Sequence, residues 1–173
     1  MIKKIFYSFV IFFIFFTQVF FFSNFHLTRY LNFILIFPLF FIVKKNNFFL
    51  FVTIFLGGII LDAAQNFSAG FFTIHLLLLV TFFYYLANIF NLKNFTSLIF
   101  YSFLFFSGYL LFSLLLTKIF VLLNWAAPVI LMNKNFYFYS LYFVVTNLFL
   151  SCLLFVFDHF YSHKNRSLNK PTF

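Results

Sequence analysis

Polar chemistry in this chain is concentrated in one short stretch, residues 56–70. Asp62 is one of only two carboxylates in a sequence that has no glutamate. Three of the four glycines also lie here, at Gly57, Gly58 and Gly70. Small residues let helices approach closely in lipid, and an ionisable side chain near a membrane marks a candidate functional residue because its burial is costly. The glycines indicate either a tight helical hairpin within one subunit or a surface for a partner's helix, and both can hold.

Asp62 has two candidate roles. A helix C-terminus repels a carboxylate, so Asp62 gains nothing by ending the apolar run that precedes it. Together with Gln65 it matches a capping box, in which Asp62 accepts hydrogen bonds from backbone N–H groups of the following turn and Gln65 reaches back. The other role is a specific contact with a partner or a ligand.

His75 lies about one turn inside the apolar run that follows Gly70, where we expect it to bond to a neighbouring helix or to Asp62. Polar side chains within apolar runs more often join helices to one another than line a pathway. The same interpretation applies to three amides in or beside the other runs, Gln18, Asn124 and Asn147.

A histidine pair near the end of the chain has the spacing of metal ligands. His159 and His163 are four residues apart beside Asp158, and they would share one face of a continuing helix. No third strong ligand is evident, so a solvated stripe at the membrane edge is favoured and no metal site is expected. The motifs of zinc proteases, serine hydrolases and phosphate-binding loops are missing as well. Because the two carboxylates lie far apart, we expect a protein that is not an enzyme and has no cofactor.

The composition excludes a water-soluble globule. Hydrophobic residues make up 65% of the 173 residues and charged residues only 8%, whereas soluble domains have roughly 45–50% and 25%. The net charge of +9 comes from bases that stand singly or in pairs between apolar runs. A role in orienting the chain in a lipid bilayer is therefore favoured over nucleic-acid binding. The single cysteine, Cys152, rules out a disulfide framework within one chain.

The apolar runs predict an all-α, polytopic transmembrane helical bundle of six spans, because about 20 apolar residues cross the bilayer core. The first run follows Lys3 and Lys4 as a signal peptide would, but it is too long and lacks a cleavage site, so we expect a retained anchor. Residues 159–173 would form a basic cytoplasmic tail. Within a transmembrane domain of residues 1–158, the expected spans are 5–22, 27–43, 48–62, 71–90, 95–117 and 136–157, with residues 119–132 interfacial or re-entrant.

Six spans place both termini on the same side of the membrane. That side would carry eight lysines and arginines and the opposite side three, and positive residues favour the cytoplasmic side. We therefore expect both termini in the cytoplasm and the turn after Asp62 facing outward.

The pattern Gly58-Ile-Ile-Leu-Asp62, with Gly70 opening an apolar span eight residues later, resembles the signature of the rod-shape-determining protein MreD family. The length, the six-span layout, the basic loop at Lys44-Lys45 and the basic tail also fit that family. The resemblance implies a non-enzymatic protein of the bacterial inner membrane within the cell-elongation machinery for peptidoglycan. Its implied partners are the bitopic protein MreC, the filament protein MreB and the peptidoglycan synthases.

Two other classes of function stay open. Substrate-binding subunits of energy-coupling vitamin transporters are six-span bundles too, but they tend to carry an Ala-x-x-x-Ala patch on the first helix. The first apolar run of this chain contains no alanine. An intramembrane enzyme is the third hypothesis, for which Asp62→Asn should remove a chemical activity rather than complex assembly.

Overall fold

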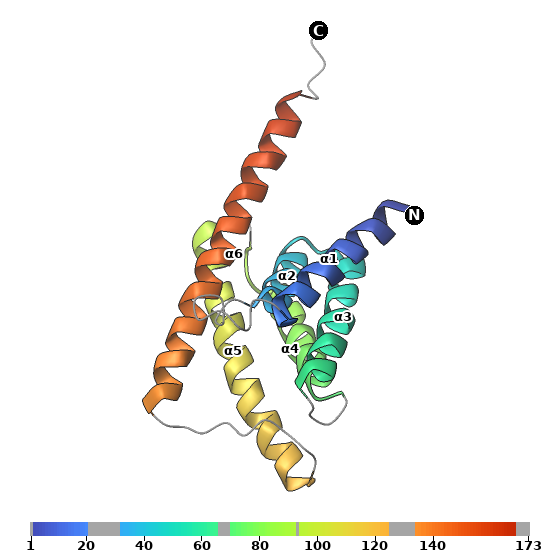
Figure 1. Ribbon diagram of the computed structural model, residues 1–173. Coiled ribbons are helices and arrows are strands. Elements are labelled where there is room, and N and C mark those ends of the chain that lie inside the picture. The colour runs from blue at the N-terminus through green and yellow to red at the C-terminus, as the bar shows by residue number, and fades with distance from the viewer. Residues whose placement is uncertain (1, 21–31, 66–69, 93, 125–133, 169–173) are drawn as a thin grey trace.

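A computed structural model describes residues 2–20, 32–65, 70–92, 94–124 and 134–168, and all regular structure in these ranges is helical (Figure 1). The expected all-α class is therefore confirmed. In Figure 1, α1 to α4 cluster beside the longer hairpin of α5 and α6. The six helices are α1 (Ile2–Phe20), α2 (Phe33–Val43), α3 (Asn47–Gln65), α4 (Phe71–Leu86), α5 (Phe95–Leu122) and α6 (Lys134–Leu168).

Three of the helices are long and apolar enough to cross a membrane. Their apolar segments are Asn47–Ala64 in α3, Phe95–Leu122 in α5 and Tyr137–Asp158 in α6. The apolar segments of α1, α2 and α4 are shorter. The 11 residues of α2 rise only about 16 Å, which is roughly half of the hydrocarbon core.

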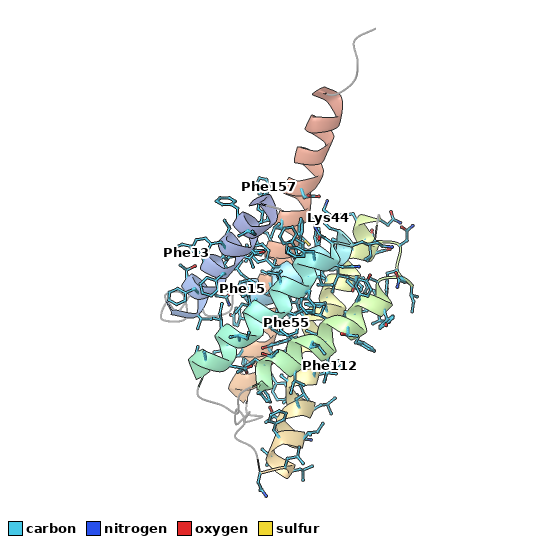
Figure 2. All side chains as sticks on the ribbon, turned by 90° about the vertical axis from the view of Figure 1, so that its right-hand side faces the viewer. Phe13, Phe15, Lys44, Phe55, Phe112 and Phe157 are labelled. Atoms are coloured by element: carbon cyan, nitrogen blue, oxygen red, sulfur yellow. The ribbon has the colours of Figure 1, made fainter. Side chains whose placement is uncertain are left out.

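The outer surface of the bundle is as apolar as a lipid-facing surface must be. Exposed aromatic rings project from helices far apart in the sequence, for example Phe13 in α1 and Phe157 in α6 (Figure 2). Phe15, only two residues after Phe13, is completely buried. Phe residues therefore serve both as core and as exposed outer surface.

The short helix α2 lies at the centre of the bundle, where it packs against each of the five other helices. It is apolar on all sides, as expected of a helix surrounded by protein. Ile34, Leu35 and Leu39 are completely buried. Pro38 lies within the same helix.

Two side chains from neighbouring helices satisfy the backbone at the start of α2. The backbone N–H of Asn32 donates to Asn147 Oδ1 of α6 at 2.8 Å, and the N–H of Ile34 donates to Gln18 Oε1 of α1 at 3.2 Å. Gln18 Nε2 also donates to Asn32 Oδ1 at 3.4 Å. The first N–H groups of a helix have no partner within it, so these side chains supply the missing acceptors. The expected role of Gln18 and Asn147 in joining helices is thus confirmed.

Helix α2 runs beside α6 in a fixed register. Three contacts define this register: Asn32 with Asn147, Phe40 with Phe155 and Lys44 with Asp158. Residue numbers rise together in the two helices from one contact to the next, which means that α2 and α6 run in the same direction.

Two further contacts bring the start of α1 and the end of α4 to the same end of the bundle as the turn between α2 and α3. The rings of Tyr7 in α1 and Phe49 in α3 meet edge to face at 6.1 Å. The hydroxyl of Tyr84 in α4 donates to Asn47 Oδ1 at 3.2 Å. The start of α1 and the end of α6 accordingly both point upward in Figure 1, and the end of α3 and the start of α4 lie at the opposite end.

Several helix ends differ from the expected spans. α3 continues three residues past Asp62, because the alanines and glutamine that follow are good helix formers. α5 continues to Leu122, so residues 119–122 are its last turn rather than part of a separate interfacial piece, and Asn124 at φ 55° ends the helix. Residues 125–132 of that expected piece lie outside the described residues.

α2 begins at Phe33 with Asn32 as its N-cap, whereas the expected span began at residue 27, and residues 27–31 lie outside the described residues. Two further differences concern α4 and α6. α4 ends at Leu86 rather than at residue 90, and asparagines that favour turns follow it. α6 continues to Leu168, so ten residues of the expected tail are helical, since no proline or glycine interrupts them.

Candidate functional site

The carboxylate of Asp62 closes the turn between α3 and α4. Its Oδ1 accepts a hydrogen bond from the backbone N–H of Phe72 at 2.7 Å. Its Oδ2 accepts from the N–H groups of Gly70 at 3.1 Å and Thr73 at 3.3 Å, and from the Thr73 hydroxyl at 2.7 Å. One side chain of α3 therefore binds four donors at the start of α4.

α4 needs this acceptor because its own N-cap residue has no side chain. Gly70 holds that position at φ +94°, a left-handed conformation that glycine adopts without the usual steric cost. The first N–H groups of any helix lack partners within the helix, and a carboxylate is favoured at that positive end. Asp62 supplies the missing cap from across the turn.

Of the two roles open for Asp62, the structure shows capping, but of a more distant helix than the motif indicated. Asp62 lies inside α3 and caps α4, whereas the capping box placed its partners in the turn directly after it. Gln65 is the last residue of α3, and its side chain lies outside the described residues. The misassignment arises because α3 does not end at Asp62.

Gly58 provides the space in which α4 approaches. A Cβ at Gly58 would stand 2.6 Å from the Thr73 Cα and 2.5 Å from its Oγ1. Positions i and i+4 share one face of a helix, so Gly58 and Asp62 present a gap and an acceptor to the same turn of α4. Thr73 fits into the gap and donates to the acceptor.

Gly57 also packs inside the subunit. A Cβ there would lie 2.6 Å from the Cγ2 of Ile34 in α2 and 3.3 Å from the Cε2 of Phe15 in α1. Both glycines are buried. Of the two interpretations of the glycines, the structure therefore shows the hairpin within one subunit, and the surfaces of Gly57 and Gly58 are covered by the chain itself.

His75 lies apart from the Asp62 cap. Its imidazole is fully buried and stacks on Tyr109 of α5 at 4.6 Å with planes 7° apart, and Tyr109 stacks in turn on Phe143 of α6. Neither ring nitrogen has a hydrogen-bond partner among the described residues. The expected bond to a neighbouring helix or to Asp62 is therefore not found there.

Of the predicted site residues, the structure brings Gly58, Asp62 and Gly70 together around Thr73, a residue that the sequence analysis missed. The position of Thr73, three residues after the N-cap, could have indicated it, because N-cap partners bond at this position. In the part of the chain that the structure describes, Asp62 has no lysine or arginine partner, so backbone dipoles and the Thr73 hydroxyl offset its charge.

The second carboxylate lies at the other end of the bundle. Asp158 pairs with Lys44, and their side chains are 32% and 38% exposed. An ion pair this exposed contributes at most about 1 kcal/mol. His159 and His163 follow in α6, but their side chains lie outside the described residues. Elsewhere in the described part, no three His, Cys, Asp or Glu side chains gather as metal ligands would.

Comparisons with protein families, with curated proteins and with solved structures find no match for this chain. Its class is therefore defined by its own structure. In the described residues it is an all-helical protein with three helices suited to cross a membrane, and a polar cap joins α3 to α4.

Proposed function

We propose that this chain is a non-enzymatic scaffold of the bacterial inner membrane that serves the cell-elongation machinery, as the resemblance to the MreD family implies. One observation supports this most: the three residues of the resembling pattern act as one unit. Gly58 makes the gap, Asp62 caps, and Gly70 starts the capped helix. A unit whose polar side chain is used to hold α4 against α3 suits a structural role better than a chemical one.

In this proposal the chain crosses the membrane six times, with both termini in the cytoplasm. The turn between α2 and α3 carries Lys44 and Lys45, and the starts of α1 and α3 lie at the same end. Positive residues favour the cytoplasmic side, so this end faces inward and the Asp62 cap faces outward.

The scaffold would hold the single span of an MreC-like partner and connect it to an MreB-like filament and to peptidoglycan synthases. Since the glycines face inward, the partner would lie against another lipid-facing surface of the bundle. The cap then has an indirect role: it fixes the outward turn and the relative positions of α3 and α4, which the partner's external domain would adjoin.

The test compares the two carboxylates. In the bacterium that encodes this chain, Asp62→Asn should reduce recovery of the single-span partner in mild detergent and round the cells, because the cap loses its charge. Asp158→Asn is the matched control: it removes the same charge from an exposed ion pair at the other end. Rod shape and full partner recovery in both variants would contradict the proposal.

The alternative is a substrate-binding membrane subunit of an energy-coupling vitamin transporter. The buried, amide-bonded start of α2 favours it, because transporters often build sites at helices that begin inside the bundle. The amides there already bond to one another, however, and the first helix has no alanine patch. A small vitamin-like molecule retained through purification would support this alternative against the scaffold.

A further inference from the structure

The end of the bundle that holds the turn between α2 and α3 gathers most of the basic residues. Tyr7 contacts Phe49 one turn after Lys3 and Lys4, which places these two lysines beside the start of α3. The Lys44–Asp158 pair places the last turns of α6 at the same end. Six bases lie in the described helices and turn at this end: Lys3, Lys4, Lys44, Lys45, Lys164 and Arg166.

The opposing charge is small. Asp158 is the only acidic side chain at this end, and Lys44 already pairs with it. At the other end the described residues hold only two bases, Lys118 and Lys134, and the Asp62 carboxylate. The charge of +9 is therefore strongly asymmetric along the bundle.

Beside these bases, a row of ring contacts crosses from α1 to α3 through the partly buried Phe49. Phe6 meets Tyr7 at 6.0 Å, Tyr7 meets Phe49 at 6.1 Å, and Phe48 meets Phe49 at 5.2 Å. Phe6 is 62% exposed and Phe48 45% exposed. The row thus offers apolar surface to lipid at the level where the chain turns polar.

A lysine precedes an exposed aromatic ring by three residues at the start of α1, and the same spacing recurs where the turn leads into α3. Lys3 precedes Phe6 by three residues in α1, and Lys45 precedes Phe48 by three residues at the start of α3. Lys45 is exposed in the turn. A phospholipid has the matching order, with a phosphate above an acyl chain, and lysine side chains reach toward the headgroups while their stems lie on apolar surface.

We propose that the face formed by the starts of α1 and α3 binds anionic phospholipid, with the positive charge at positions 3, 4 and 45 attracting the phosphate groups and Phe6 and Phe48 contacting the acyl chains. Charge complementarity selects anionic over zwitterionic lipid, since each lysine near an anionic surface contributes about 1 kcal/mol. This lipid site does not depend on the proposed scaffold role, because it concerns lipid rather than a protein partner.

The experiment uses the full chain in vesicles of equal parts phosphatidylglycerol and phosphatidylcholine. One sample contains a trace of spin-labelled phosphatidylglycerol, and a second contains a trace of spin-labelled phosphatidylcholine. Electron spin resonance then gives the association constant of each labelled lipid at the protein surface. The wild-type protein should prefer phosphatidylglycerol several-fold at low salt, and 1 M NaCl should largely remove the preference because surface charges are screened.

Two triple variants identify the end of the bundle that is responsible. Replacing Lys3, Lys4 and Lys45 with Gln should remove most of the several-fold phosphatidylglycerol preference, since a single charge contributes up to about 1 kcal/mol, or about fivefold. The matched control replaces Lys118 and Lys134 at the other end, together with Arg29, which the six-span layout assigns to that side, with Gln; it removes the same charge and should keep most of the preference. A variant with Lys3, Lys4 and Lys45 changed to Arg should keep it too.

Three results would overturn the proposal. They are an absent preference in the wild-type protein, equal losses in both Gln triples, and loss of the preference in the charge-conserving Arg triple. If the first Gln triple keeps its lipid preference but loses a co-purifying acidic protein, the face is a protein-docking surface and the lipid proposal is wrong.

Discussion

The Asp62 carboxylate makes four hydrogen bonds, and three of them go to backbone N–H groups that have no other acceptor within α4. This explains why a carboxylate can lie near the end of α3, where the helix dipole disfavours it. The positive end of α4 compensates for the negative end of α3. The balance is local and does not need a basic partner.

Removing this acceptor should destabilise the protein without preventing membrane insertion. We expect Asp62→Ala to cost about 2 kcal/mol of unfolding free energy, the upper range for an N-cap, because Gly70 offers no replacement. Asp62→Asn should cost less, since its amide oxygen still accepts. Denaturation of the purified protein in mixed micelles measures both, and wild-type stability of Asp62→Ala would contradict the capping role.

Glycine substitutions should distinguish the need for space at Gly58 from the need for a left-handed backbone conformation at Gly70. Gly58→Ala places a methyl group 2.6 Å from the Thr73 backbone, which no rotamer relieves, so we expect a loss of about 3 kcal/mol. Gly70→Ala meets only Ile74 at 3.9 Å and should cost about 1 kcal/mol through its positive φ. Ile59→Ala, at an exposed neighbour of Gly58, is the control. Thermal unfolding in detergent should rank the three, and an equal loss for Ile59→Ala would count against the close contact.

At the scale of the element, α2 is the least self-sufficient helix. Its 11 residues rise through only about half of the hydrocarbon core, and its first backbone donors depend on Gln18 and Asn147 from two other helices. Its position therefore depends on α1 and α6, and these amides connect the α1–α4 cluster with the α5–α6 hairpin.

Asn147→Leu should loosen the start of α2 selectively. The substitution leaves the Asn32 N–H without its acceptor, at a cost of about 1 kcal/mol, the lower end of the range for a buried donor, because the bond is part-buried. Hydrogen–deuterium exchange should speed up at residues 34–36, while the amides of α3 stay protected. Thr146→Val is the control, because the Thr146 hydroxyl bonds only within α6, to Tyr142 and Phe143. Unchanged exchange in Asn147→Leu would show that α2 does not need this bond.

The sequence predicted the helical elements well and the contacts between them poorly. A capping role for Asp62 follows from its charge at a helix end, but the identity of the capped helix depends on how α3 and α4 meet, which no local pattern encodes. The contribution of Thr73 was missed for the same reason. His75 shows the opposite case, since a polar residue in an apolar run predicted a bond and the structure gives an aromatic stack.

At the scale of the whole molecule, the contacts Tyr7–Phe49 and Lys44–Asp158 gather the start of α1 and the end of the apolar part of α6 at one end. The Asp62 cap and the last turn of α5 lie at the other end, where Phe71 and Phe120 meet at 4.9 Å. The molecule thus has a basic end and an end defined by the cap.

Cysteine labelling should reveal which side each end faces. In a Cys152→Ser background, Ala63→Cys places a thiol at an exposed position beside the cap, and Lys45→Cys places one in the basic turn. A membrane-impermeant maleimide should label Ala63→Cys in intact spheroplasts and Lys45→Cys only after lysis. The reverse pattern would contradict the proposed orientation. Labelling of both variants in intact spheroplasts would contradict the placement of the two ends on opposite sides of the membrane.

The most direct test of the cap is a double-mutant cycle between Asp62→Ala and Thr73→Val, measured as unfolding free energy in mixed micelles. Because the Thr73 hydroxyl donates to Asp62 Oδ2 at 2.7 Å, the two losses should be non-additive, with a coupling of about 1 kcal/mol. Losses that add within about 0.3 kcal/mol would mean that the two side chains do not act together, and the hairpin would then need another explanation.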